Sequence, residues 1–121
     1  MMEFSDNKPI YRQISDYAFN CIIEGKWVVG EKIPSVRELA VELGVNTRTV
    51  LKALEYLQDT NVINPRRGMG FILATDAVSK VMQERRSEFF NSSLPALLQE
   101  MNRLGITPAE LLDHINNHKS S

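Results

Sequence analysis

Apolar residues recur at helical spacing in three stretches of the first half of the chain. In the first stretch, roughly residues 10–24, they stand at Ile10, Ile14, Tyr17, Ala18, Cys21 and Ile22. In the next two they stand at Val36, Leu39, Ala40 and Leu43, and at Val50, Ala53, Leu54 and Leu57. Apolar positions three or four residues apart fall on one side of a helix. The pattern therefore predicts three amphipathic helices, with a short connection between the second and the third.

Capping residues mark the ends of the second and third helices. Ser35 is followed three residues later by Glu38, a spacing typical of the capping box at a helix start. Gly44 ends the second helix, because the left-handed turn at a helix C-terminus favours glycine. Asn46 caps the third helix. Two short helices joined by a glycine-containing turn indicate a helix-turn-helix motif.

A β-hairpin is predicted directly after the third helix. Val62 and Ile63 begin one strand, residues 64–69 contain turn-forming proline and glycine, and residues 71–73 form the returning strand. The hairpin tip is basic because it contains the dipeptide Arg66-Arg67.

From Asp76 onward strand signals end, and apolar residues again follow helical spacing. We expect a helical arm with a kink or break near residues 91–94, because Pro95 disturbs a regular helix. A last helix begins after Thr107, which starts a capping box. The apolar positions assigned to dimerisation are Val78, Met82, Phe89, Phe90, Leu94, Leu97, Leu98, Met101 and Leu104.

An arm of this length builds only a thin core of its own. A second copy of the chain is therefore the expected partner, and the alternative is that the arm folds back on its own winged helix. The predicted fold is mainly α with a small β-hairpin. It consists of a winged helix-turn-helix domain over residues 1–75 and a two-helix dimerisation arm over residues 76–121.

The residues on the outer side of the third helix indicate binding to DNA. Thr47, Arg48 and Lys52 lie opposite the apolar stripe, near the end that such a helix inserts into the major groove. A guanidinium can donate two hydrogen bonds to a guanine edge, so we expect Arg48 to read a base and Lys52 to hold a phosphate. Arg66 and Arg67 fit a wing against phosphates or the minor groove. The alternatives are a solvated charged face on the helix and merely solubilising charge on the hairpin.

Between about residues 8 and 73 the chain resembles the GntR family of bacterial transcription regulators. The segments PIYRQISDYAFNCIIEGKWVVGEKIPS, RELAVELGVNTRTVLKAL and RRGMGFIL follow, in order, the family's opening helix, helix-turn-helix and glycine-rich wing. Asn61 departs from the pattern where a glycine is common, and Ile72 where an aromatic residue is frequent. The two C-terminal helices resemble the YtrA-like subfamily, whose members dimerise through them and often repress nearby transporter genes.

This resemblance implies contacts with DNA. Arg37 would contact the backbone or a base, and residues 47–49 would face the major groove. Arg67 and Gly68 would lie against the minor groove, and Ser35 would touch phosphate as well as cap its helix. From the chemistry and the resemblance together, the candidate DNA-binding residues are Ser35, Arg37, Asn46, Thr47, Arg48, Thr49, Lys52, Arg66, Arg67 and Gly68.

Net charge does not by itself indicate a nucleic-acid-binding protein. The chain has 14 Lys and Arg residues against 15 Asp and Glu residues, so its formal net charge is −1. A general nucleic-acid binder is expected to be basic, so any positive field must be local. We therefore expect modest nonspecific affinity and a steep salt dependence.

Signals for other functions are weak. We find no phosphate-binding loop, no nucleophile near a histidine and no carboxylate pair in a predicted cleft, and therefore expect no enzyme and no cofactor. His114 and His118 could share a metal with nearby Asp113, but such residues are common near helix C-termini, and we expect no metal. Cys21 is the single cysteine, and we expect it to be a small core residue. Without a signal peptide or an apolar stretch long enough to cross a membrane, the expected location is cytoplasmic.

The predicted function is sequence-specific transcription regulation by a homodimer that binds double-stranded DNA, as a repressor on an inverted-repeat operator. The alternative is a winged-helix module that binds protein or RNA without operator recognition. Two C-terminal helices offer no obvious pocket, so a small-molecule effector is left unassigned.

Overall fold

The computed structural model describes residues 2–119, which fall into two compact units, Met1–Gln83 and Glu84–Ser121. We describe each unit by itself. The sequence suggested a boundary between residues 75 and 76, whereas the first compact unit extends to Gln83. The difference arises because the first turns of helix α4 (Ala77–Glu88) belong to the first unit, where Ala77 and Val81 are fully buried in the core.

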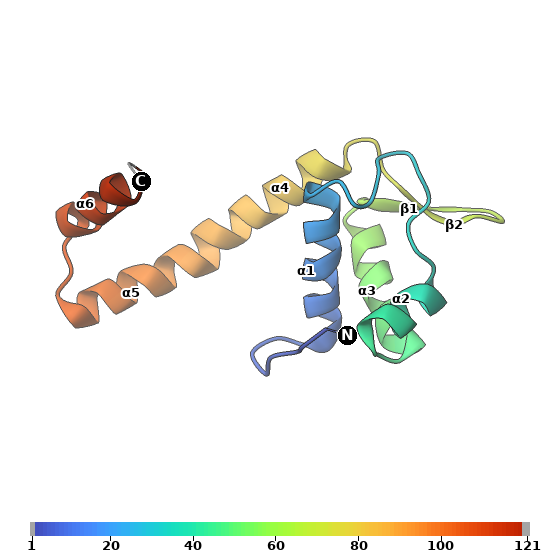
Figure 1. Ribbon diagram of the computed structural model, residues 1–121, viewed down its shortest axis with the longest axis horizontal. Coiled ribbons are helices and arrows are strands. Elements are labelled where there is room, and N and C mark those ends of the chain that lie inside the picture. The colour runs from blue at the N-terminus through green and yellow to red at the C-terminus, as the bar shows by residue number, and fades with distance from the viewer. Residues whose placement is uncertain (1, 120–121) are drawn as a thin grey trace. The chain divides into compact units, whose positions relative to one another are not determined.

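Three helices and a β-hairpin form most of the first unit, in the predicted order. Helix α1 spans Ile10–Ile23, α2 spans Val36–Leu43 and α3 spans Thr47–Asp59, while strands β1 and β2 span Ile63–Arg66 and Gly70–Leu73. In Figure 1, α1 lies beside α3, α2 lies against the start of α3, and the hairpin projects away from the helices. This is a winged helix-turn-helix. Together with the helices of the second unit, it confirms the predicted mainly α fold with one small hairpin.

The first strand of the hairpin is longer than predicted. Strand β1 continues through Pro65 and Arg66, where the sequence suggested a turn, and pairs antiparallel with β2. The connection is correspondingly tight, and the amide of Met69 donates to the carbonyl oxygen of Arg66 over 2.9 Å. Gly68 within it has a φ of 77°, which glycine adopts without strain.

The extended link before α2 pairs briefly with the other edge of strand β2. Lys32 pairs with Ile72 in an antiparallel bridge, and the amide of Ile33 donates to the carbonyl oxygen of Phe71 over 3.0 Å. Strand β2 is therefore flanked on both sides, and β1 is the outer strand.

The apolar stripe of α3 forms the centre of the core, as predicted. Its members, Val50, Ala53, Leu54 and Leu57, are each no more than 1 % exposed. Helix α1 differs from the prediction, because Ile10 is 46 % exposed, whereas Phe19, absent from the predicted apolar face, is 2 % exposed. Ile10 is the first residue of the helix, while Phe19 packs in one cluster with Trp27 and Ile33 of the following link.

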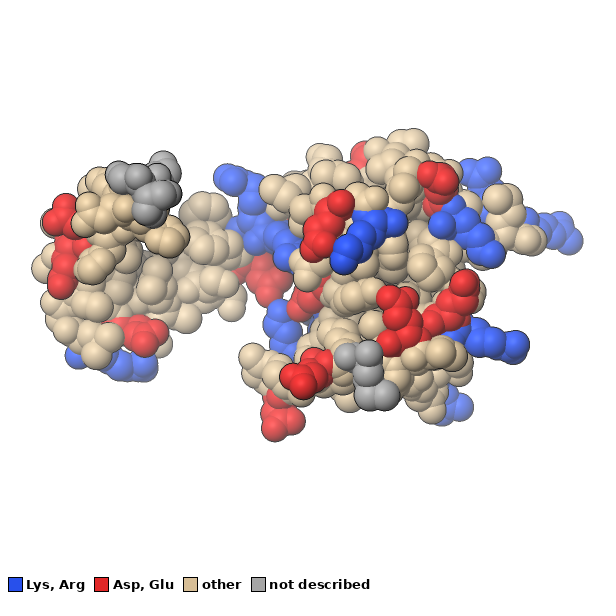
Figure 2. Space-filling view, in the orientation of Figure 1, with Lys and Arg blue, Asp and Glu red and all other residues tan. Residues whose placement is uncertain are grey.

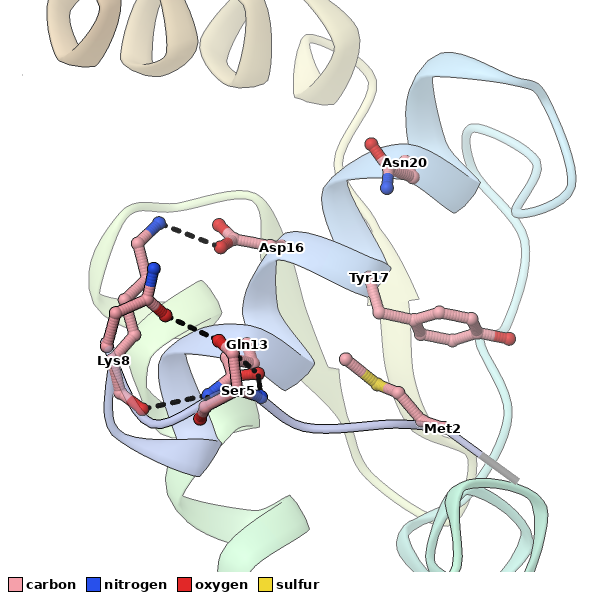
Figure 3. Close-up of a pocket in the computed structure, with 8 residues that line it drawn as sticks. Met2, Ser5, Lys8, Gln13, Asp16, Tyr17 and Asn20 are labelled. Atoms are coloured by element: carbon pink, nitrogen blue, oxygen red, sulfur yellow. Dashed lines mark hydrogen bonds and ion pairs between the residues drawn. The ribbon is translucent and has the colours of Figure 1, made fainter. Parts of the chain in front are cut away.

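Residues 2–8 fold back along α1 and are held there by Gln13 (Figure 3). The side-chain nitrogen of Gln13 donates to the carbonyl oxygens of Ser5 and Lys8, each over 2.8 Å. Its side-chain oxygen accepts from the amide of Ser5 over 2.9 Å. Lys8 also forms an ion pair with Asp16 at 3.0 Å. A single buried amide thus fixes the path of the N-terminal segment.

This path places two apolar side chains, Met2 and Phe4, against the helix-turn-helix. Both pack on a second buried cluster composed of Ile14, Leu43 and Ala53. Because these three residues come from α1, α2 and α3, the N-terminal segment covers the point where the three helices meet.

The second unit begins with the end of α4, which passes into a π-helical turn, Phe89–Ser93, and directly into α5, Leu94–Leu104. We expected a kink or a break at this place. The backbone instead widens for one turn and continues as α5, with Pro95 in its first turn. A π-helical turn shifts the hydrogen-bond register by one residue. This shift accommodates Pro95, whose backbone nitrogen carries no hydrogen to donate.

The last helix, α6, spans Pro108–Lys119 and begins where the sequence predicted. Thr107 Oγ1 accepts a hydrogen bond from the amide of Glu110 over 3.2 Å. Gly105 ends α5 with a φ of 70°. Across residues 2–119 no helix combines the length and the apolar character needed to cross a membrane.

The turn from α3 into β1 places an asparagine where glycine is usual. Asn61 has a φ of 62°. Its amide donates to the carbonyl oxygen of Gln58 over 2.9 Å, and the amide of Val62 donates to that of Leu57 over 3.0 Å. This pair of bonds is a Schellman motif, which requires a left-handed residue at the position of Asn61. Asparagine tolerates that conformation better than most residues, so the departure from the family pattern at Asn61 preserves the turn.

We expect Asn61→Ala to lower the free energy of unfolding by about 1 kcal/mol, because alanine disfavours the left-handed conformation. Asn61→Gly should leave it nearly unchanged, since glycine adopts this φ freely. Urea unfolding measures both. Asn64→Ala, which changes an exposed asparagine in strand β1, is the matched control, and an equal loss at the two positions would contradict this account.

Candidate nucleic-acid interface

The first turn of α2 is held by reciprocal hydrogen bonds. Ser35 Oγ accepts from the amide of Glu38 over 3.1 Å, and Glu38 Oε1 accepts from the amide of Ser35 over 2.9 Å. The hydrogen bond from the Ser35 amide favours the carboxylate and holds the pKa of Glu38 below its ordinary value. Arg37 lies in this turn with an exposed side chain. The predicted capping box therefore fixes the backbone beneath a surface guanidinium and leaves the Ser35 hydroxyl proton available to a phosphate.

The first turn of α3 is fixed in a similar way. Asn46 Oδ1 accepts from the amide of Arg48 over 2.7 Å, which confirms the predicted cap and leaves the Asn46 side-chain nitrogen for other contacts. Thr47 and Arg48 are exposed. Thr49, predicted to face the groove with them, is half-buried.

Lys52 is exposed, but an aromatic ring determines where its ammonium lies. Its Nζ is 4.4 Å from the centroid of the Tyr11 ring, which comes from the first turn of α1. Tyr11 was not among the predicted site residues, and only its aromatic character could have drawn attention to it. The two residues are far apart in the chain, and it is the packing of α1 on α3 that brings them together.

The hairpin tip presents the other predicted contacts. Arg66, Arg67 and Gly68 are all exposed there. Within the described range, residues 2–119, no atom outside the adjoining residues lies within 4 Å of the place where a Cβ on Gly68 would be. This glycine therefore serves the turn, and the surface beside it is open to a ligand.

Basic side chains lie along one edge of the first unit. In Figure 2, Lys and Arg project from the edge that carries the hairpin tip, α2 and the start of α3 in Figure 1. Arg37 and Arg48 are the cationic residues of α2 and of the first turn of α3, and Arg66 and Arg67 are those of the hairpin. On the face turned toward the viewer, Asp and Glu lie among other Lys and Arg side chains. A chain with almost balanced charge thus presents a locally positive edge.

Internal contacts engage two polar groups of α1. The Tyr17 hydroxyl donates to Glu42 Oε1 over 2.7 Å, which links α1 to α2, and this hydrogen bond raises the pKa of Tyr17. Cys21 is 3 % exposed, and burial raises the pKa of its thiol. A buried thiol held in its neutral form fits the predicted role of Cys21 as a core residue.

Among residues 2–119 no group of three His, Cys, Asp or Glu side chains is placed to hold a metal ion. His114 and His118 lie one turn apart on α6.

Comparison with known proteins identifies relatives that match most of the chain. Residues 10–73 match the family described as bacterial regulatory proteins, gntR family. The uncharacterized HTH-type transcriptional regulator YhcF of Bacillus subtilis (strain 168) is 31 % identical over 93 % of this chain and 92 % of its own length. The HTH-type transcriptional repressor YtrA of the same organism is 30 % identical over 88 % of this chain and 82 % of its own.

Solved structures share both the fold and the sequence pattern. A GntR family transcriptional regulator from Listeria monocytogenes superposes with a TM-score of 0.78 and 32 % identity, over 94 % of this chain and 98 % of that one. AraR(DBD) in complex with operator ORR3 superposes with a TM-score of 0.54 and 27 % identity, over 61 % of this chain and 89 % of that one. The family match spans the helix-turn-helix and the hairpin, and the similarity to YtrA extends beyond them. The chain therefore belongs to the GntR family of bacterial regulatory proteins, within its YtrA-like subfamily.

Proposed function

We propose that this chain binds double-stranded DNA sequence-specifically as a homodimer and represses transcription from an inverted-repeat operator. The observation that carries the proposal is the packing of α3. Its apolar stripe is buried, so Thr47 and Arg48, which are both exposed, face outward on the other side of the helix. Similarity to a protein named as a repressor, and to one solved with its operator, supports the same function. We assign it no catalytic role and no cofactor, and such a regulator would act in the cytoplasm.

Each candidate side chain has a role that fits its chemistry. Arg48 would donate two hydrogen bonds to a guanine edge in the major groove. Arg37 and Lys52 would hold phosphates, and Arg66 and Arg67 would contact phosphates or the minor groove. The remaining candidates, which would supply further backbone or base contacts, are Ser35, Asn46, Thr47, Thr49 and Gly68.

The second unit supports the proposed homodimer. Of residues 84–118, Met101 alone is buried, at 6 % exposure. The large apolar side chains that remain exposed in this unit are Phe89, Phe90, Leu97, Leu98, Leu104, Leu112 and Ile115. Val78 and Met82, earlier on α4, are also exposed, and Leu94 is half-buried. A unit that covers so little of its own apolar surface gains stability when a second copy covers the rest.

Selection of bound sequences from a random duplex pool tests the function. A dimer that docks two recognition helices on one DNA face should enrich an inverted repeat whose half-site centres are about 34–36 Å apart. A winged helix that binds protein or RNA would leave the duplex pool unenriched, and that result would overturn the proposal.

Arg48→Ala should weaken binding to the selected sequence by about 1–3 kcal/mol and relax the preference at one base position. Arg48→Lys, which keeps the charge but loses the two-pronged donor, should relax the preference in the same way. Repeating the selection with each variant measures both effects. An unchanged preference after Arg48→Ala would show that Arg48 is not the base reader.

Arg66→Ala should weaken binding to all duplex sequences by a similar factor, because a phosphate contact carries no sequence information. Because the proposed dimer loses one phosphate contact in each subunit, the magnitude of the slope of log K against log salt concentration should fall by about 1.8. Titrations at several salt concentrations provide the slope. If the loss were confined to one base position, Arg66 would be reading sequence instead.

Leu98→Asp should convert the dimer to a monomer, because it places a carboxylate on the exposed apolar side of α5, where Leu98 is 52 % exposed. Gln99→Asp adds the same charge at a neighbouring exposed polar position and should leave the dimer intact. Sedimentation velocity distinguishes the two states. A wild-type chain that sediments as a monomer would count against dimerisation itself.

A further inference from the structure

Four side chains interleave where the first turn of α1 meets the outer side of α3. Lys52 Nζ lies 4.4 Å from the centroid of the Tyr11 ring, and Arg12 Cζ lies 4.6 Å from that of Tyr56. The two rings contact each other edge to face, with centroids 6.5 Å apart and an interplanar angle of 70°. The order across the surface is therefore cation, ring, ring, cation, with both helices contributing to each cation–ring pair.

The Tyr11 ring is a fixed platform and not a mobile surface group. It is half-buried and packs against the second apolar cluster, which contains Leu43 and Ala53 of the helix-turn-helix. The edge of Tyr56 supports it from α3, and the guanidinium of Arg12 covers the Tyr56 ring. Contacts from two helices thus determine the orientation of Tyr11.

Lys52 depends on this platform for its position. Its side chain is exposed, and no carboxylate among residues 2–119 forms an ion pair with it. The ring occupies one side of the ammonium and leaves the other side open, so Lys52 can meet an anion without leaving Tyr11. Lys52 also lies one turn after Arg48 on α3, where helix geometry makes the two residues neighbours.

We propose that Tyr11 is a positioning residue for DNA binding, which holds the Lys52 ammonium ready for a backbone phosphate. This proposal rests on the function proposed above. A free lysine side chain samples many rotamers and loses that freedom when it binds a phosphate. A lysine already held over a ring has lost part of this rotamer freedom before DNA binds, so binding costs less conformational entropy. Tyr11 therefore strengthens binding to DNA of any sequence, without itself reading a base.

A double-mutant cycle on the selected duplex tests the proposal. Tyr11→Leu removes the aromatic face and should raise Kd about two- to five-fold, the range expected for an exposed cation–π contact. Tyr11→Phe keeps the ring and should bind as the wild type does. In the background of Lys52→Met, Tyr11→Leu should have no further effect, because the cation that the ring positions is gone.

Arg66→Ala provides the matched control, because Arg66 lies on the hairpin, away from the first turn of α1. Combined with Tyr11→Leu, its effect on Kd should be additive. Thermal unfolding of each variant confirms that it is folded at the temperature of the titration. A merely structural role for Tyr11 would weaken binding by the same factor whether or not Lys52 is present.

Two results would overturn the proposal: wild-type affinity for Tyr11→Leu, or an equal loss for Tyr11→Leu in the wild-type and Lys52→Met backgrounds. Both differ from failure of the proposed function, in which the wild-type chain itself would enrich no duplex.

Discussion

The rotation of α3 about its own axis is the constraint on which the rest of the structure depends. Successive residues of a helix point about 100° apart, so a shift of one residue would turn Arg48 away from the groove that we propose it reads. Four fully buried side chains prevent this, because burying a Val or Leu side chain contributes about 1.5–3 kcal/mol and rotation would expose the stripe. The same packing directs the outer side of the helix toward solvent. Apolar burial, and not net charge, therefore arranges the cations.

Helix α1 and the N-terminal segment also limit how side chains near the surface of α3 can move. The segment is pinned by Gln13 and covers the cluster where the three helices meet, while the first turn of α1 brings Tyr11 to Lys52. Contacts with α1 thus hold a side chain on the polar side of α3, while burial in the core holds its apolar side. In a family whose members are regulators, this offers a way for residues outside the recognition helix to influence binding.

Local signals were enough to predict much of the fold. The Ser35 and Glu38 capping box, the Asn46 cap and the turn at Gly44 each depend on residues within a few positions of one another, and all are present. The α3 stripe followed from spacing alone. Phe19 was missed because its burial depends on the link between α1 and α2, which packs back against α1. The π-helical turn before Pro95 was missed because a shift of hydrogen-bond register leaves little trace in apolar spacing.

In the candidate site, too, some features follow from local sequence and others depend on tertiary packing. Exposure of Arg37, Arg48 and the hairpin arginines follows from the pattern of each element, so the sequence identified them. The partial burial of Thr49 and the contact of Lys52 with Tyr11 depend on how helices pack, which no local pattern contains. The assignment of individual DNA contacts remains a prediction.

The outer position of β1 has a consequence for molecules gathered at one operator. An uncovered strand edge is a template on which another chain can extend the sheet. Here that edge contains Pro65, which offers no amide hydrogen, followed at once by a cationic residue, so a second strand would meet an incomplete ladder and like charge. Neighbouring wings should therefore remain separate at high local concentration, and each hairpin stays free for nucleic acid instead of joining an aggregate.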